Sequence, residues 1–175
     1  MRLAVFCGSR TGTKPTFADT ARSFGAALAR RKIGLVYGGA SVGTMGILAD
    51  AVLAGGGEVI GVIPRSVFKS EVAHQKLTKL HVVASMHERK ALMAQLADGF
   101  VALPGGTGTF DELFEILTWR QIGIHDKRIG ILDAGGYYAP LRAMLAAIVG
   151  EGFGDPAPID VVSDDVDRVI DLVVG

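Results

Sequence analysis

Short apolar runs alternate with longer segments of helical periodicity along almost the whole chain. The apolar runs indicate strands at Leu3–Cys7, Gly34–Tyr37, Val59–Ile63, His81–Ala84, Phe100–Leu103, Arg128–Leu132 and Ile159–Val162. The intervening periodicity predicts helices over about Thr16–Arg31, Gly43–Ala54, 86–97, Phe110–Ile122, Tyr138–Val149 and Val166–Val173. Residues 65–78 are polar and mixed, which predicts a loop containing a partial helix.

The strand segments are nearly continuous in apolar residues and do not alternate with polar ones. Such runs are typical of parallel strands that are covered on both faces. Strands alternating with helices predict an α/β fold: a doubly wound, Rossmann-like parallel sheet of about seven strands with helices on both faces. No linker or repeat divides the chain, so we expect one domain over residues 1–175.

Composition and charge narrow the class of protein. Hydrophobic residues make up 49% and charged residues 21%, which is typical of a globular chain. The longest uncharged run, Ile33–Ala49, contains five glycines and is too short for a membrane span. The N-terminus lacks a signal-peptide pattern and Cys7 is the only cysteine, so we expect a cytoplasmic protein without disulfides.

Charge is unevenly distributed although the net charge is zero. Residues 1–150 hold 17 Lys and Arg against 11 Asp and Glu, and residues 151–175 hold seven acidic residues against one basic residue. A mildly basic body favours a small anionic ligand. The excess is too weak for a general nucleic-acid surface, and ordinary solvated charges explain most of it.

Glycine-rich loops follow three of the predicted strands, at 8–12, 38–46 and 104–109. In a parallel sheet these strand ends lie at one edge, where α/β folds bind ligands. The loop at Pro104–Thr109 opens a helix, whose N–H groups favour an anion such as a phosphate. No Lys-Ser/Thr pair follows its glycines, so it is not a Walker motif, and the first loop has Gly8 and Gly12 at the wrong spacing for the dinucleotide fingerprint. A mononucleotide phosphate is therefore favoured. Purely structural glycine turns remain the alternative.

Several charged residues are candidates for chemistry near these loops. Glu112 follows Thr109 by three residues, so it is either a capping-box residue or a carboxylate beside the phosphate site. Ser85 and Glu88 form a second capping box that places Arg89 and Lys90 in the first turns of a helix. Cations are mildly unfavourable there, so the pair indicates either an anionic substrate or two side chains that simply reach solvent. Glu115 is expected to be a solvated or interface residue.

Two other classes of site are disfavoured. The four histidines lack metal-ligand spacing, so no metal site is expected. The segment Gly39–Gly43 matches the letters of a nucleophile elbow around Ser41, but no histidine follows Asp133 to complete a triad. Cys7 is interpreted as a small buried apolar residue.

The chain resembles the LONELY GUY (LOG) family of cytokinin-activating phosphoribohydrolases. The resemblance is carried by Ser85–Lys90 and by Pro104–Glu112, which reproduces the family's P-G-G-x-G-T-x-x-E block. It continues through Thr118–His125 and Gly136–Tyr138, and begins at Cys7–Ser9 and Val36–Gly39. It therefore spans nearly the whole chain up to Phe153.

The resemblance implies hydrolysis of the N-glycosidic bond of N6-modified adenosine 5′-monophosphates, and of AMP, without a metal or cofactor. It implies Arg89 and Glu112 as the catalytic pair. It also implies substrate binding by Gly8, Ser9, Gly38, Gly39, Glu71, Met86, Lys90, Gly105, Gly106, Thr107, Gly108 and Thr109. Shorter members of the family are typically dimers, and we expect a homodimer that uses the helix over Phe110–Ile122 close to Glu112.

Two departures from the family pattern bear on base preference. Ala40 stands where the family usually has a third glycine, and Arg10 stands where it often has serine. The alternative function is a nucleotide- or cofactor-binding protein that does not cleave its ligand. The presence of both Arg89 and Glu112 favours the enzyme. Many relatives carry the label lysine decarboxylase, which nothing in this sequence supports.

Overall fold

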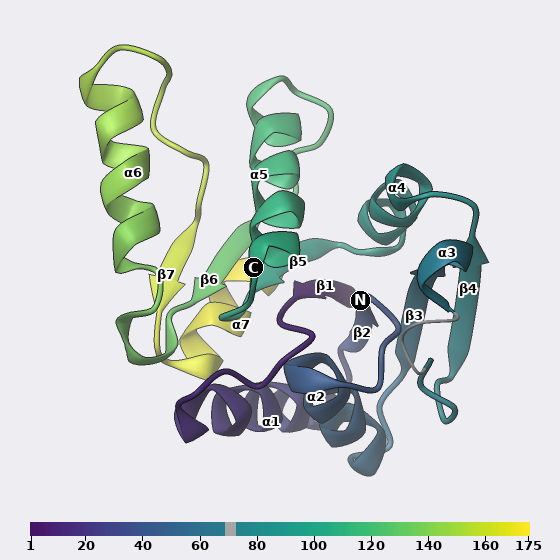
Figure 1. Cartoon of the computed structure of the whole chain (residues 1–175). Helices are drawn as coiled ribbons and strands as arrows, with labels where there is room; N and C mark the ends of the chain where they lie inside the picture. The colour runs from purple at the N-terminus through teal and green to yellow at the C-terminus, as the bar shows by residue number, and fades with distance from the viewer. Residues whose placement is uncertain (69–72) are drawn as a thin grey trace.

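The computed structural model of the chain describes residues 1–68 and 73–175. Seven parallel strands form one sheet in the order β4-β3-β2-β1-β5-β6-β7 (Figure 1). The strands are β1 Arg2–Phe6, β2 Gly34–Tyr37, β3 Val59–Pro64, β4 Lys79–Val83, β5 Gly99–Ala102, β6 Ile129–Leu132 and β7 Val161–Ser163. The α-helices are α1 Pro15–Arg30, α2 Gly43–Ala54, α3 Arg65–Phe68, α4 Met86–Leu96, α5 Thr107–Gln121, α6 Ala139–Gly150 and α7 Val166–Val174.

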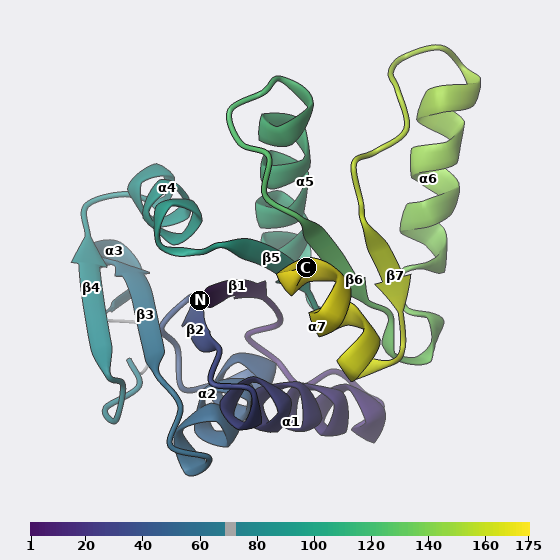
Figure 2. The same cartoon turned by 180° about the vertical axis from the view of Figure 1, so that it is seen from behind.

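Helices cover both faces of the sheet, which confirms the predicted fold class (Figures 1 and 2). On one face α1, α2 and α7 bury a core that includes Phe24, Leu28 and Leu48. On the other face α4 and α5 bury a second core around Phe100 and Met93. Strands β2, β3, β5 and β6 are buried along their whole length, as continuous apolar runs require.

The order of the strands reverses at β1, which lies at the centre of the sheet. Ala4 pairs with Val36 of β2 on one side and with Phe100 of β5 on the other. The helices that follow β1 and β5 therefore lie on opposite faces, and their connecting loops separate at the sheet edge. A crevice at such a point is where doubly wound folds bind ligands.

Some predicted boundaries differ from the structure. The helix expected from Phe110 begins at Thr107, because Gly106 adopts the extended backbone of a cap residue and the helix starts directly after it. Strand β4 begins two residues earlier than expected, since Lys79 pairs with Ile60 at the edge of the sheet. Strand β7 begins at Val161, two residues later than expected, and ends at Ser163, where it pairs with Leu132.

Helices α5 and α6 both extend beyond the sheet in the same direction (Figures 1 and 2). Leu141 is the one buried residue that α6 contributes to the core. The helices of the described residues are all too short or too polar to cross a bilayer.

Candidate active site

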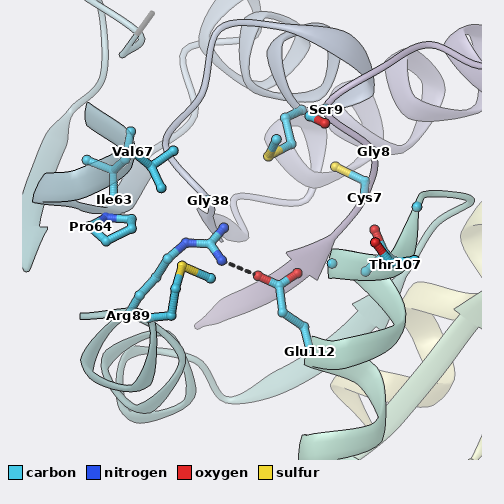
Figure 3. Close-up of a pocket in the computed structure, with 15 residues that line it drawn as sticks. Cys7, Gly8, Ser9, Gly38, Ile63, Pro64, Val67, Arg89, Thr107 and Glu112 are labelled. Carbon is cyan, nitrogen blue, oxygen red and sulfur yellow. Dashed lines mark hydrogen bonds and ion pairs between the residues drawn. The ribbon is translucent and has the colours of Figure 1, made fainter. Parts of the chain in front are cut away.

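Ten of the predicted site residues line one cavity of about 250 Å³ at the carboxyl ends of the central strands (Figure 3). They come from the loops after β1, β2 and β5 and from helices α4 and α5. They are Gly8, Ser9, Gly38, Met86, Arg89, Gly106, Thr107, Gly108, Thr109 and Glu112. The cavity lies beside the crevice created by the reversal of strand order, which is where the glycine loops predicted a ligand.

Arg89 and Glu112 both line this cavity and point toward each other (Figure 3). Arg89 Nη1 donates to Glu112 Oε1 at 2.6 Å, and Arg89 Nε donates to the carbonyl oxygen of Val62 at 3.0 Å. The side chains are only 11% and 8% exposed. The guanidinium is thus held from both sides, and the carboxylate is fixed in a nearly dry environment.

Burial shapes the electrostatics of the cavity. Loss of hydration raises the pKa of Glu112, and the neighbouring Arg89 charge opposes that rise without cancelling it. Burial likewise raises the pKa of the Cys7 thiol to about 12, so this thiol stays protonated and is not a nucleophile. Glu112 is therefore the titratable side chain of the cavity suited to charge stabilisation or proton transfer.

The N-terminus of α5 forms one wall of the cavity. Gly106 caps this helix without a side-chain hydrogen bond, so its first N–H groups have no protein cap. Thr109 Oγ1 is buried and has no hydrogen-bond partner among the described residues. A Cβ on Gly105 would collide with the Thr109 side chain, so the close approach of the loop requires glycine there. These donors fit an anion such as a phosphate.

The two predicted capping boxes have different outcomes. Ser85 Oγ accepts from the Glu88 backbone N–H at 3.1 Å, so α4 starts at Met86 as predicted. The Thr109–Glu112 capping box is wrong, because Thr109 is the third residue of α5 and Gly106 is its cap. Glu112 therefore does not cap the helix, and its carboxylate pairs with Arg89 instead.

An apolar wall completes the cavity and was not predicted. Ile63, Pro64 and Val67 come from the end of β3 and from α3, and Met45 comes from α2. Figure 3 shows Ile63, Pro64 and Val67 on the side opposite Thr107. The one feature of the sequence that could have predicted this wall is that Ile63 and Pro64 end an apolar strand segment, at the edge where the glycine loops lie. The wall fits the flat apolar face of a nucleobase.

Three predicted substrate-binding residues among those that the structure describes do not line this cavity. Gly39 has a positive φ of 82° and its carbonyl oxygen accepts from His74 N at 3.1 Å. Lys90 pairs with carboxylates of α5. Gly105 lines only an adjoining cavity. Glu71 lies outside the described residues.

Glu115 is partly buried and paired with Lys90, so the expectation of a solvated residue is wrong, and the alternative of an interface residue stays a prediction. Ala40, one of the two departures from the family pattern, is buried in the hydrophobic core and is not among the residues that line the cavity.

The adjoining cavity, of about 420 Å³, shares Gly8, Ser9, Gly106 and Thr107 with the first. Arg10 and Tyr137 line it. Tyr137 Oη donates to the Gly105 carbonyl at 2.5 Å, and Tyr138 Oη donates to the Leu103 carbonyl at 2.7 Å. The two tyrosines therefore hold the loop that presents the N-terminus of α5.

Solved structures share this architecture. The Moco carrier protein from Chlamydomonas reinhardtii superposes with a TM-score of 0.73 at 20% identity, covering 99% of this chain and 94% of that one. The molybdenum cofactor binding protein from Rippkaea orientalis gives 0.74 at 18% identity, with the same coverage. At these identities the similarity concerns the fold alone.

Sequence comparison is more specific. A profile of the family described as "Possible lysine decarboxylase" matches residues 45–173. The cytokinin riboside 5′-monophosphate phosphoribohydrolase of Rhodococcoides fascians is 51% identical over 156 residues, 89% of this chain and 79% of that protein. The enzyme LOG1 of Arabidopsis thaliana is 48% identical over 155 residues, 89% of this chain and 73% of that protein. The chain belongs to the LOG family of cytokinin riboside 5′-monophosphate phosphoribohydrolases.

Proposed function

We propose that this protein hydrolyses the N-glycosidic bond of N6-modified adenosine 5′-monophosphates, and of AMP, to the free base and ribose 5-phosphate. The observation that carries the proposal is the buried Arg89–Glu112 pair beside the open N-terminus of α5. One cavity thus combines a fixed carboxylate with an anion-binding helix end. Relatives at about half identity are named for this reaction.

The geometry supports one orientation of the substrate. The 5′-phosphate lies at the Gly106–Thr109 turn. There its oxygens accept hydrogen bonds from the uncapped N–H groups and from the Thr109 hydroxyl, which has no partner among the described residues. The ribose then lies over Glu112, about one and a half helical turns further along α5. The base packs against the apolar wall around Ile63 and Pro64.

The reaction breaks the bond between ribose C1′ and the base nitrogen, and water oxygen bonds to C1′. Positive charge develops on the ribose in an oxocarbenium-like transition state. The Glu112 carboxylate stabilises that charge and orients the attacking water. One water proton ends on the departing base and the other stays on the new hydroxyl of ribose 5-phosphate. Arg89 keeps Glu112 in place and offers N–H donors to the departing base.

A substrate panel tests this proposal. AMP, N6-isopentenyl-AMP, GMP, CMP and adenosine are incubated with the enzyme, and base release is followed by chromatography. We expect release from the adenosine monophosphates and a rate on adenosine lower by about two orders of magnitude, because adenosine lacks the charge-assisted phosphate contacts. Equal rates on adenosine and AMP would contradict the phosphate site.

Two other functions are less well supported. A non-catalytic binding protein would hold AMP without releasing adenine, so the same panel separates it from the enzyme. A lysine decarboxylase using pyridoxal phosphate needs a lysine in the site for the Schiff base. Among the described residues that line the cavity, none is a lysine. The site therefore favours phosphoribohydrolase chemistry.

We also infer a homodimer in the cytoplasm. Large apolar side chains are exposed on and after α6, at Met144, Ile148, Val149 and Phe153, the last being 85% exposed. Ile122 and Ile124 are exposed beyond the end of α5. Patches of this kind mark protein interfaces, and two-fold dimers are the commonest soluble assembly.

The exposed residues favour an interface at the end of α5 remote from Glu112. Phe114 and Trp119, in contrast, pack partly against the protein's own core. Light scattering is expected to give about twice the chain mass of 18.3 kDa, and Phe153→Asp is expected to lower it. An active wild-type protein with the mass of one chain would refute the dimer.

A further inference from the structure

Lys90 joins α4 to α5 through ion pairs with two carboxylates of α5. Its Nζ lies 3.1 Å from Asp111 Oδ2 and 3.1 Å from Glu115 Oε1, and its side chain is 10% exposed. It does not line the cavity that holds Arg89 and Glu112. The adjacent residue Arg89 makes the parallel contact to Glu112, so two successive residues of α4 both bind α5.

The partners of Lys90 flank Glu112 along α5. Asp111 immediately precedes Glu112, and Glu115 follows it by three residues, on the neighbouring turn. Asp111 is 57% exposed, so water screens its attraction to Lys90. Glu115 is 21% exposed and is the less screened partner. Its Oε2 is buried and has no hydrogen-bond partner among the described residues, so its contact with Lys90 runs through Oε1.

Charged side chains of α4 and α5 gather in this region, with one more carboxylate than cations. Three carboxylates of α5 face two cations of α4, and burying an unpaired charge is costly. Burial lowers the pKa of Lys90, but the hydrogen bonds to Glu115 and Asp111 outweigh this and raise it overall. Lys90 is therefore charged at neutral pH and fully engaged by the protein.

We propose that Lys90 is a positioning residue that clamps α4 to α5 through Glu115, and that it does not contact the substrate phosphate. The proposal rests on the proposed function. By fixing the two helices, the clamp keeps Arg89 and Glu112 in contact at the wall of the cavity. A displacement of about 1 Å at such a site lowers turnover by about 100-fold, so loss of the clamp acts on kcat.

The test uses Lys90→Met, Glu115→Leu and the double variant. Turnover and KM are measured with AMP, and the Kd of ribose 5-phosphate is measured by calorimetry. We expect each single variant to lower kcat by about tenfold or more while KM and Kd change by less than about threefold. The double variant is expected to be no slower than the slower single variant, because both changes break one contact.

The double variant keeps the proposal testable if the single variants do not fold. Removing one partner leaves a buried charge, whereas removing both is much better tolerated. A Kd of ribose 5-phosphate weakened by about tenfold in the double variant would show that Lys90 contacts the phosphate. Multiplying losses of kcat would show that Lys90 and Glu115 act separately. Either result overturns the proposal.

Arg22→Met is the matched control, since Arg22 makes an exposed ion pair with Asp19 on α1, away from the site. It is expected to leave kcat, KM and Kd unchanged. A wild-type protein that releases no base overturns both the proposed function and the clamp. An active wild type with independent Lys90 and Glu115 effects overturns the clamp alone.

Discussion

Replacement of Glu112 by glutamine is the most direct test of the chemistry. Glutamine keeps the size of the side chain and an acceptor for Arg89 Nη1, but it removes the negative charge. A unit charge about 4 Å from a developing positive charge, at an effective dielectric constant of about 20, contributes about 4 kcal/mol. That energy corresponds to about 1,000-fold in rate. Arg89 neutralises part of the charge, so we expect kcat to fall by about 100- to 1,000-fold.

The fold is expected to tolerate this change. Two effects on the free energy of unfolding oppose each other: the variant relieves the burial of a charge whose pKa is already raised, and it leaves the Arg89 charge without its partner. Arg89 keeps its hydrogen bond to the Val62 carbonyl. A net change of about 1 kcal/mol corresponds to about 2–4 °C in the thermal midpoint of a chain this long.

The assay is chromatographic release of adenine from AMP, with calorimetric binding of ribose 5-phosphate as the check on the site. The phosphate site at the N-terminus of α5 is untouched, so the Kd of ribose 5-phosphate should stay within about threefold. Glu115→Gln keeps an acceptor for Lys90 and is the control, with a loss of only a few-fold. A Glu112→Gln variant within about tenfold of wild-type kcat would refute the charge-stabilisation argument.

Three further expectations concern pH, reactivity and the loop before α5. Because ionised Glu112 is the active form and its pKa is raised by burial, kcat/KM should fall with decreasing pH at a midpoint above the usual glutamate range, which a pH–rate profile measures. The raised pKa also means that Glu112 stabilises the fold at low pH and that this contribution is lost as pH rises through the folded pKa; denaturation midpoints of Glu112→Gln should lack this slope. Cys7, whose pKa is raised to about 12, should resist iodoacetamide in the native protein and react after denaturation; stoichiometric native labelling would contradict its burial. Tyr137→Phe should raise the KM for AMP with a smaller effect on kcat, because its hydroxyl holds the Gly105 carbonyl, and an unchanged KM would separate that contact from binding.

The class of fold could be derived from the sequence because its signals are local. Continuous apolar runs predicted buried parallel strands, and the observed sheet has seven. Ser85 and Glu88 lie three residues apart, so their capping box predicted the start of α4 correctly. The glycine loops predicted a ligand site at the strand ends, since every parallel strand brings its end to the same edge. The resemblance to a family then predicted which of those loop residues would bind the substrate, and that assignment stays a prediction.

The contacts that define the chemistry were decided only by the tertiary structure. Arg89 and Glu112 are 23 residues apart, and their 2.6 Å contact depends on how α4 and α5 dock on the sheet. The same docking directs the Lys90 side chain to Glu115 and not into the cavity. The apolar wall from β3 depends on β3 lying beside β2 in the sheet. Hydrogen bonds between chain neighbours and the periodicity of burial are properties of one segment, so the sequence of that segment determines them. A contact between distant segments depends on strand register and helix packing, which the sequence of one segment does not determine.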